Sequence, residues 1–170
     1  RTNAQSRAIE QAFTKNRPVV PYTIVGGLRF YERKEVKDII AYLRVVDNPR
    51  DMEGLRRIIN VPKRGIGDKT IQVLVDAAAE TDLSLLDVMR DSSLNPLSES
   101  SKQGQSIRKL IKLIDSLIEK KADTSASEMI EQVMRETGYL TALKEDGSIE
   151  AETREQNLHE LLAGATSYVE

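Results

Sequence analysis

Apolar residues along most of the chain recur every three or four positions, the period of an α-helix that buries one face. The pattern predicts helices over residues 3–16, 32–46, 51–59, 68–79, 83–89, 107–118, 126–134 and 151–168, with a turn or short helix over 139–143. On the second helix the expected core residues are Val36, Ile39, Ile40, Leu43 and Val46. The sequence therefore predicts a mainly α fold.

The N-terminal portion departs from this pattern. Pro18 and Pro21 end the first helix, and residues 22–25 are short and β-branched, as strands are. A single strand leaves its backbone groups unpaired, so we expect its partner strands to lie outside this chain. We therefore predict at most one or two short strands, and interpret residues 1–27 as the edge of a neighbouring domain.

Three other places are expected to interrupt the helices. Residues 91–106 contain six Ser and few apolar positions, which predicts an exposed and mobile loop. Gly138 is expected to cap helix 126–134, and Asp146-Gly147 to break the chain before the last helix.

Between two predicted helices lie residues 60–67, with the sequence NVPKRGIG. The two glycines permit backbone angles closed to other residues and leave room for a close ligand. Amides at the start of the next helix, together with the helix dipole, attract anions. Lys63, Arg64 and Lys69 add positive charge, and Thr70 adds a hydroxyl. We interpret the segment as a hairpin that holds a nucleic-acid phosphate, although a helix C-cap followed by an N-cap explains the same glycines without any ligand.

The distribution of charge favours the first interpretation. The whole chain has a net charge of −2, but residues 1–75 hold 15 Lys and Arg against 8 Asp and Glu. The remaining residues hold 10 against 19. The basic half contains the hairpin, and such an asymmetry is typical of a surface for a polyanion. On the helix over 32–46, Arg33, Lys37 and Arg44 are spaced to form one cationic stripe, which equally suits an ordinary exposed face.

Composition excludes several other functions. The chain has no Cys, which rules out disulfides and thiolate metal sites, and no cluster of carboxylates has the spacing of a metal site. It has no Trp and two Phe, too few for a platform that stacks bases. The lone His159 is expected to be structural or exposed rather than catalytic, and no signature of a catalytic site is present. No signal peptide or apolar run long enough to span a bilayer is present, so we expect a cytoplasmic protein with no membrane partner.

Four segments resemble the PcrA/UvrD/Rep family of superfamily 1 DNA helicases, nearest to its PcrA branch. They are residues 1–7, 21–38, 60–67 and 153–158, in the order that the family has. Residues 17–21 look about two residues longer than the family's usual connection, and residues 91–106 match it poorly.

This resemblance implies a division of the chain. Residues 1–27 would be the edge of the RecA-like motor domain 2A, and residues 28–170 the helical accessory subdomain 2B with its helix-hairpin-helix-like element. The parent would be a bacterial ATP-dependent helicase that moves 3′ to 5′ and binds ATP and Mg. The ATPase motifs lie outside this chain, which would bind no cofactor and be inactive alone.

The resemblance also assigns roles residue by residue. Contacts to duplex DNA, ahead of the fork, fall on Lys37, Gly65, Ile66, Gly67 and Thr70, to which we add Arg64 for its charge and Arg44 for its place on the stripe. Contacts to the single strand fall on Arg1, Asn3 and Arg29. Gly26-Gly27 suits a hinge because glycine absorbs large backbone changes, although a plain turn that ends the predicted strand explains the pair equally well.

We expect DNA and the motor domains of the same helicase as partners. An alternative is a protein-docking and autoinhibitory module that uses the acidic half of the chain and has little affinity for DNA. The sequence leaves both functions open.

Overall fold

The computed structural model describes residues 30–166, and every regular element in that range is helical. The elements are η1 (Phe30–Glu32), α2 (Lys34–Asp47), α3 (Met52–Ile58), α4 (Asp68–Ala79), α5 (Leu85–Arg90), α6 (Lys102–Lys120), η2 (Lys121–Asp123), α7 (Ala126–Glu136), α8 (Tyr139–Asp146) and α9 (Ile149–Thr166). Because the described range contains no strand, the predicted mainly α fold is confirmed there. The strand predicted at residues 22–25 lies outside that range.

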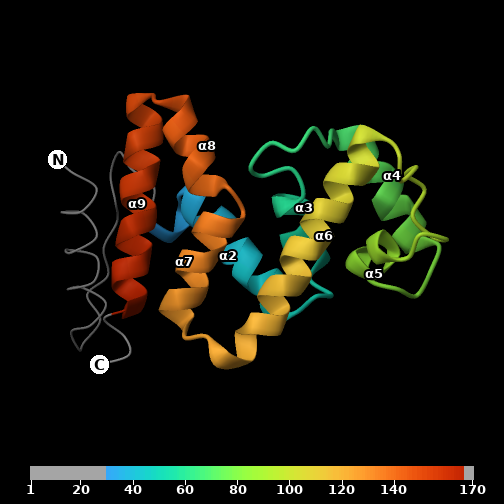
Figure 1. Cartoon of the computed structure of the whole chain (residues 1–170), viewed down its shortest axis with the longest axis horizontal. Coiled ribbons are helices and arrows are strands. Elements are labelled where there is room, and N and C mark those ends of the chain that lie inside the picture. Colours follow the sequence, from blue (N-terminus) through green and yellow to red (C-terminus); the bar gives the residue numbers. More distant parts are fainter. Residues whose placement is uncertain (1–29, 167–170) are drawn as a thin grey trace.

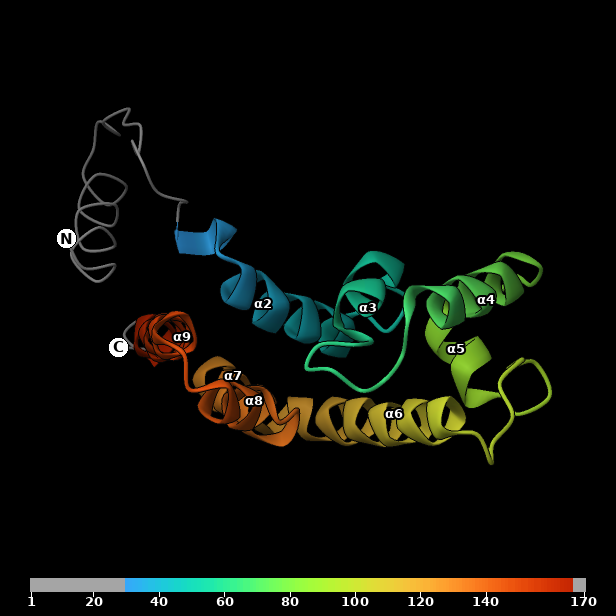
Figure 2. The same ribbon diagram turned by 90° about the horizontal axis from the view of Figure 1, so that it is seen from above.

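The helices are spread along the longest axis of the molecule, with α9 at one end and α4 and α5 at the other (Figure 1). Seen from above, α2, α3 and α4 follow one side of the molecule, and α6, α7, α8 and α9 follow the other (Figure 2). At one end α5 contacts both α4 and α6. Near the other end α2 packs against α3, α6, α7 and α9, so this helix organises the core.

The buried face of α2 is wider than a single apolar stripe. Its buried hydrophobic residues are Val36, Ile39, Ala41, Tyr42, Val45 and Val46. By contrast, the predicted core residues Ile40 and Leu43 are only partly buried. The reason is tertiary, since α3 covers one flank of α2 while α6, α7 and α9 cover another.

Local sequence explains where several helices begin and end. Asp51 caps α3, and Ser125 and Glu128 form a capping box at the start of α7. Gly138 and Gly147, with φ angles of 77° and 62°, adopt the left-handed conformation that follows α7 and α8. The predicted ends near these two glycines are confirmed.

The N-terminal part of α2 and its N-cap residue carry charged side chains into the interior. Arg33 Nη1 donates to Asn157 Oδ1 at 2.9 Å, and Asn157 Nδ2 donates to Glu35 Oε1 at 2.5 Å. The hydroxyl of Tyr139 donates to Asp38 Oδ2 at 2.8 Å. Burial and the Asp38 carboxylate raise the pKa of Tyr139, so it remains a donor. Since these buried polar groups are hydrogen-bonded, they tie α2 to α8 and α9.

The loop predicted over residues 91–106 ends earlier, at Ser101, because α6 begins at Lys102. Asn95 Nδ2 donates to the carbonyl oxygen of Met89 at 3.0 Å and holds the loop against α5. The prediction missed the first turn of α6, because that turn consists of polar residues and shows no apolar periodicity. Ser101 as an N-cap was the available signal.

Candidate nucleic-acid interface

The chain between α3 and α4, residues 59–67, contains the predicted hairpin and is called the α3–α4 loop. In Figure 1 it is the green coil that rises above α3. Ile66 has an exposed fraction of 0%, whereas Gly65 and Gly67 on either side of it are exposed. Ile66 therefore anchors the loop in the core and presents both glycines to solvent.

Two polar residues set the path of this loop. Asn60 Oδ1 accepts hydrogen bonds from the backbone N–H groups of Arg64 at 2.8 Å and Ile66 at 3.2 Å. The guanidinium of Arg64 turns inward and donates to the carbonyl oxygen of Ile58 at 3.0 Å and the hydroxyl of Tyr42 at 2.6 Å. The structure thus places Arg64, a predicted phosphate contact, as a support beneath the loop.

Tyr42 completes this support from α2. Its hydroxyl donates to the carbonyl oxygen of Val61 at 2.5 Å while it accepts from Arg64. Burial raises the pKa of Tyr42, and the nearby Arg64 only partly offsets this effect, so the phenol remains protonated. Our sequence reasoning missed Tyr42 and Asn60. The available signals were a tyrosine on a core helix, whose hydroxyl needs a partner, and an asparagine beside a glycine-rich turn.

The two glycines of the loop differ in whether their backbone conformation favours glycine. Gly65 has a φ of 72°, a left-handed angle that favours glycine. Gly67 has φ −84° and ψ 167°, which any residue adopts, and a Cβ added there would meet nothing within 4 Å. Gly67 is the N-cap of α4, where glycine is one of several favoured residues, so capping permits glycine at this position but does not require it.

Several amides at the start of α4 are available to a ligand. Within residues 30–166, the backbone N–H groups of Gly67, Asp68 and Lys69 have no hydrogen-bond acceptor. Lys63 and Lys69 are exposed and have no ion-pair partner in the same range, while the exposed Asp68 adds an opposing negative charge. The N–H of Thr70 donates to the carbonyl oxygen of Gly67 at 3.0 Å, which places this partly exposed residue in the first turn.

An open depression of about 660 Å³ lies between α2 and α3 and is called the α2–α3 groove. Its lining residues are Tyr31, Lys37, Ile40, Ala41, Arg44, Glu53, Gly54, Arg56 and Arg57. Arg44 Nε lies 2.8 Å from Asp51 Oδ2, so the charge of this predicted contact is largely neutralised. Lys37 is exposed.

The predicted cationic stripe on α2 needs a correction. Arg33 is 9% exposed and its guanidinium is directed to Asn157 of α9, so it does not continue the row of Lys37 and Arg44 on the surface. Helical spacing aligns the three residues, but the packing of α9 against α2 covers the first.

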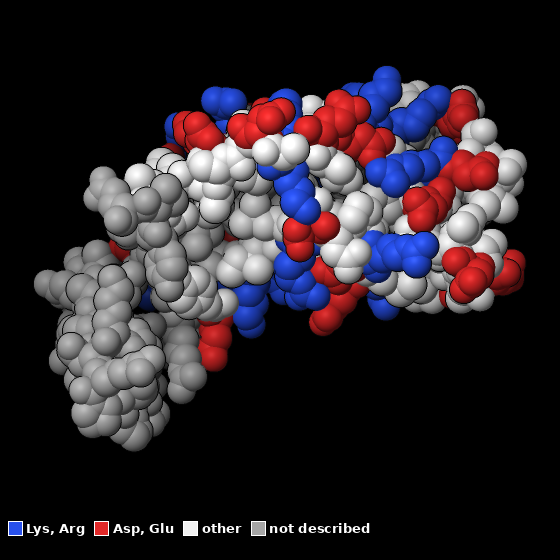
Figure 3. All heavy atoms as spheres, turned by 90° about the horizontal axis from the view of Figure 1, so that it is seen from below, with Lys and Arg blue, Asp and Glu red and all other residues white. Residues whose placement is uncertain are grey.

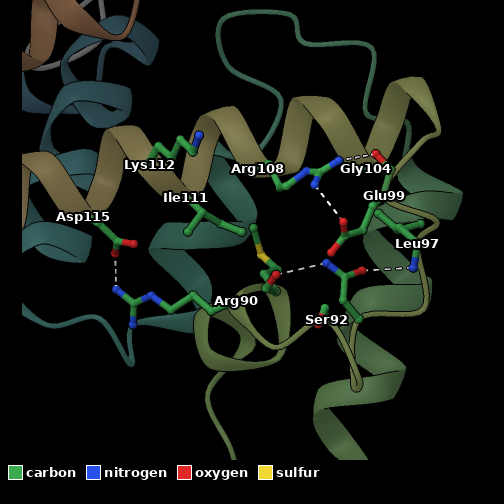
Figure 4. Close-up of a pocket in the computed structure, with 11 residues that line it drawn as sticks. Arg90, Ser92, Leu97, Glu99, Gly104, Arg108, Ile111, Lys112 and Asp115 are labelled. Carbon is green, nitrogen blue, oxygen red and sulfur yellow. Dashed lines mark hydrogen bonds and ion pairs between the residues drawn. The ribbon is translucent and has the colours of Figure 1, made fainter.

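A second cavity, of about 330 Å³, lies between α5, the loop over residues 91–101, and α6. Figure 4 shows Arg90 extending to Asp115 and Arg108 extending to Glu99, where Nη1 and Oε2 are 2.8 Å apart. Both arginines are paired, which leaves Lys112 as the one lining cation without a side-chain partner among the described residues, so this cavity is a weaker candidate for an anion. On the face shown in Figure 3, basic and acidic side chains alternate and neither forms a continuous patch.

Other kinds of site find no support in residues 30–166. No group of three or more His, Cys, Asp or Glu side chains there could hold a metal ion. No helix among these residues has the length and apolarity needed to cross a membrane. The predicted single-strand contacts Arg1, Asn3 and Arg29, and the hinge Gly26-Gly27, lie outside the described residues.

Comparison with known proteins tests the family resemblance. Residues 1–168 match the family described as UvrD-like helicase C-terminal domain. The chain is 39% identical over 170 residues to the ATP-dependent DNA helicase PcrA of Staphylococcus epidermidis and 36% identical to that of Staphylococcus aureus. Each match covers 100% of this chain but only 23% of the relative, so the chain spans less than a quarter of their length. The chain therefore belongs to the UvrD-like helicase C-terminal domain family.

Proposed function

We propose that this chain is a DNA-binding accessory subdomain of an ATP-dependent DNA helicase that moves 3′ to 5′ on DNA. Membership of the family and similarity to helicases named PcrA support the proposal. Residues 28–170 would form subdomain 2B and residues 1–27 the edge of motor domain 2A. The motor domains elsewhere in the parent would bind ATP and Mg, and this chain alone would hydrolyse no ATP.

The single observation that carries the DNA-binding role is the glycine at position 67. The backbone angles of Gly67 and the empty space around it accept any side chain, so the fold does not require glycine there. A side chain at this exposed position would, however, keep a large ligand away from the amides that begin α4. A phosphate in close contact with those amides accounts for the glycine.

Under this proposal α3, the α3–α4 loop and α4 act as a helix-hairpin-helix-like grip. The free amides at the start of α4 bind a phosphate oxygen, and the α4 dipole adds to the attraction. Lys63 and Lys69 supply positive charge, and the hydroxyl of Thr70 adds a donor. Lys37 contacts a further phosphate from α2. Arg44 contributes less, because Asp51 already neutralises it.

Other predicted contacts serve the grip indirectly. Arg64 and Ile66 hold the loop in shape from below, and Gly65 allows its turn. From the resemblance we also propose that Arg1, Asn3 and Arg29 contact the single strand and that Gly26-Gly27 is a pivot between the subdomains.

A grip of this kind has two physical consequences. Contacts to phosphates position a protein on DNA without reading its sequence. They also weaken as salt rises, because binding releases condensed counterions. The subdomain would orient the duplex while the motor domains of the same helicase draw one strand away.

The test is fluorescence anisotropy with duplex, forked and single-stranded DNA at two salt concentrations, comparing the chain with its Gly67→Asn variant. Asn is a favourable N-cap, so α4 should remain intact. We expect duplex affinity to fall about tenfold, equivalent to about 1.4 kcal/mol. Gly147→Asn is the matched control, because Asn tolerates the left-handed angle at that exposed helix end and should leave affinity unchanged.

Equal binding by the wild type and the Gly67→Asn variant would contradict the proposed grip. If the wild type binds no DNA at low salt, the alternative function gains support. The chain would then be a protein-docking and autoinhibitory module, and adding it in trans should bind and slow the motor domains of its helicase.

A further inference from the structure

The α2–α3 groove contains more positive charge than its acidic neighbours neutralise. Four cations and one carboxylate, Glu53, line it. Arg44 pairs with Asp51 and lies 3.9 Å from Glu53, and Arg57 pairs with Asp38 at 2.8 Å. The other two, Lys37 and Arg56, are exposed and have no side-chain partner in the described part of the chain. The cavity of Figure 4, whose arginines are both paired, has one such cation, Lys112, whereas this groove has two.

An exposed tyrosine lies at the same groove. Tyr31 has an exposed fraction of 60%, although its ring contacts Phe30 edge-on with centroids 5.2 Å apart. Phe30 is only 1% exposed and belongs to the core, so it holds the tyrosine ring from one side. A tyrosine hydroxyl is one of the side-chain groups that donate hydrogen bonds to DNA phosphates.

The groove adjoins the proposed grip through the chain itself. Arg56 lies on the last turn of α3, about one turn before Asn60, which sets the path of the α3–α4 loop. The short helix α3 packs on α2, the helix that provides Lys37. Gly54 makes this packing possible, because a Cβ there would lie 3.1 Å from Val45 Cγ2 and 2.6 Å from Asp51 Oδ2.

We infer that the α2–α3 groove is a second phosphate site, in which Tyr31 and Arg56 act with Lys37 on the sugar-phosphate backbone of duplex DNA. The planar guanidinium of Arg56 can present two N–H groups to phosphate oxygens, Lys37 acts as a point charge, and the hydroxyl of Tyr31 donates one hydrogen bond. The inference rests on the proposed function and adds Tyr31 and Arg56 to its contacts.

The lining favours DNA over an acidic protein segment. Protein interfaces depend on apolar or aromatic anchors that fill well-packed pockets. Apart from Tyr31, the hydrophobic side chains of this groove are Ile40 and Ala41, and Ala41 is only 3% exposed. An open polar groove with spare cations suits a phosphate backbone, which needs charge and donors rather than an anchor.

The test measures duplex affinity by anisotropy over a series of salt concentrations for Arg56→Ala, Tyr31→Phe and the control Lys109→Ala. Lys109 is exposed on α6 and also has no side-chain partner among residues 30–166, so its removal changes net charge equally. We expect Arg56→Ala to weaken binding about two- to fivefold and to lower the slope of log K against log salt by about 0.9. Tyr31→Phe should weaken binding less and leave the slope unchanged, and circular dichroism should confirm that each variant is folded.

The possible failures are distinguishable. If Arg56→Ala matches Lys109→Ala while Gly67→Asn still loses affinity, the groove is not a phosphate site and the proposed function stands. If the wild type binds no duplex at low salt, both proposals fail. If Arg56→Ala instead loses binding to poly-glutamate and keeps its affinity for duplex, the groove takes an acidic protein and the inference is wrong.

Discussion

The loop over residues 91–101 and the α3–α4 loop are each followed by a helix with a glycine at its start. These two glycines, Gly104 and Gly67, differ in their surroundings. A Cβ at Gly104, in the first turn of α6, would lie 2.1 Å from the carbonyl oxygen of Ser98. A Cβ at Gly67 would meet nothing within 4 Å. Packing against the loop over residues 91–101 therefore requires a glycine at position 104. Packing around the α3–α4 loop sets no such requirement at position 67.

The charges near the two loops differ only in part. Beside the loop over residues 91–101, Arg90 and Arg108 are both paired with carboxylates, while Lys102 and Lys112 have no ion-pair partner among the described residues. Lys63 and Lys69 beside the α3–α4 loop have no ion-pair partner within residues 30–166. Where a glycine and the cations around it are satisfied internally, the structure alone explains them. Where they are not, as at Gly67, Lys63 and Lys69, the proposed phosphate contact would explain them.

Among the substitutions that test this comparison, Gly104→Ala should have the largest effect, which is on stability. The new Cβ would overlap the Ser98 carbonyl, which also accepts from the N–H of Ser101 at 3.0 Å and cannot move away without losing that bond. We expect a net loss of about 2 kcal/mol in the free energy of unfolding, because overpacking should outweigh the roughly 1 kcal/mol that Ala gains over Gly within a helix. Urea denaturation measures this, and Gly67→Asn should stay within about 0.5 kcal/mol of wild type. An unchanged midpoint for Gly104→Ala would refute the packing role.

An intermediate effect should come from removing the side chain that shapes each loop. Asn60→Ala leaves two backbone amides of the α3–α4 loop without an acceptor, which should cost about 1–3 kcal/mol of stability and also reduce duplex affinity. Asn95→Ala removes a donor to Met89 and an acceptor for Leu97 in the other loop. It should lower stability to a similar degree and leave DNA affinity unchanged, as chemical denaturation and anisotropy together would reveal. Equal losses of affinity in both variants would mean that the loops do not differ in function.

The smallest effect should come from single surface cations. Arg108→Ala breaks an exposed ion pair with Glu99, worth less than about 1 kcal/mol, and should leave DNA binding unaltered. Lys69→Ala removes no ion pair among the described residues and should reduce the salt slope of duplex binding by about 0.9. A reduced slope in both variants would indicate a general effect of charge and would remove the distinction between the loops.

Local signals in the sequence predicted much of the fold. The predicted helix over residues 68–79 has the bounds of α4, and the one over 32–46 differs from α2 by two residues at its start and one at its end. Apolar periodicity and turn residues are local features that span only a few positions of the sequence, so they locate helices well. They missed the first turn of α6, because its polar residues carry no apolar period.

The sequence located the α3–α4 loop but not its internal arrangement, and its role as a site stays a prediction. The segment with Gly65 and Gly67 was identified from its glycines and cations alone. The inward orientation of Arg64 could not be identified in this way, because its partner Tyr42 lies 22 residues away on another helix. Arg33 was misplaced for the same reason, since its partner Asn157 is 124 residues distant.

The sequence by itself therefore determined that the chain is helical, that a glycine-rich loop with cations joins two of its helices, and that it resembles a helicase family. Only the tertiary structure decided which of the cations are available. Folding brings carboxylates to Arg44 and Arg57 and buries Arg33, while Lys37 and Arg56 remain exposed. The physical reason is that a charge belongs to its residue, whereas its neutralisation depends on groups that only folding brings within a few ångströms.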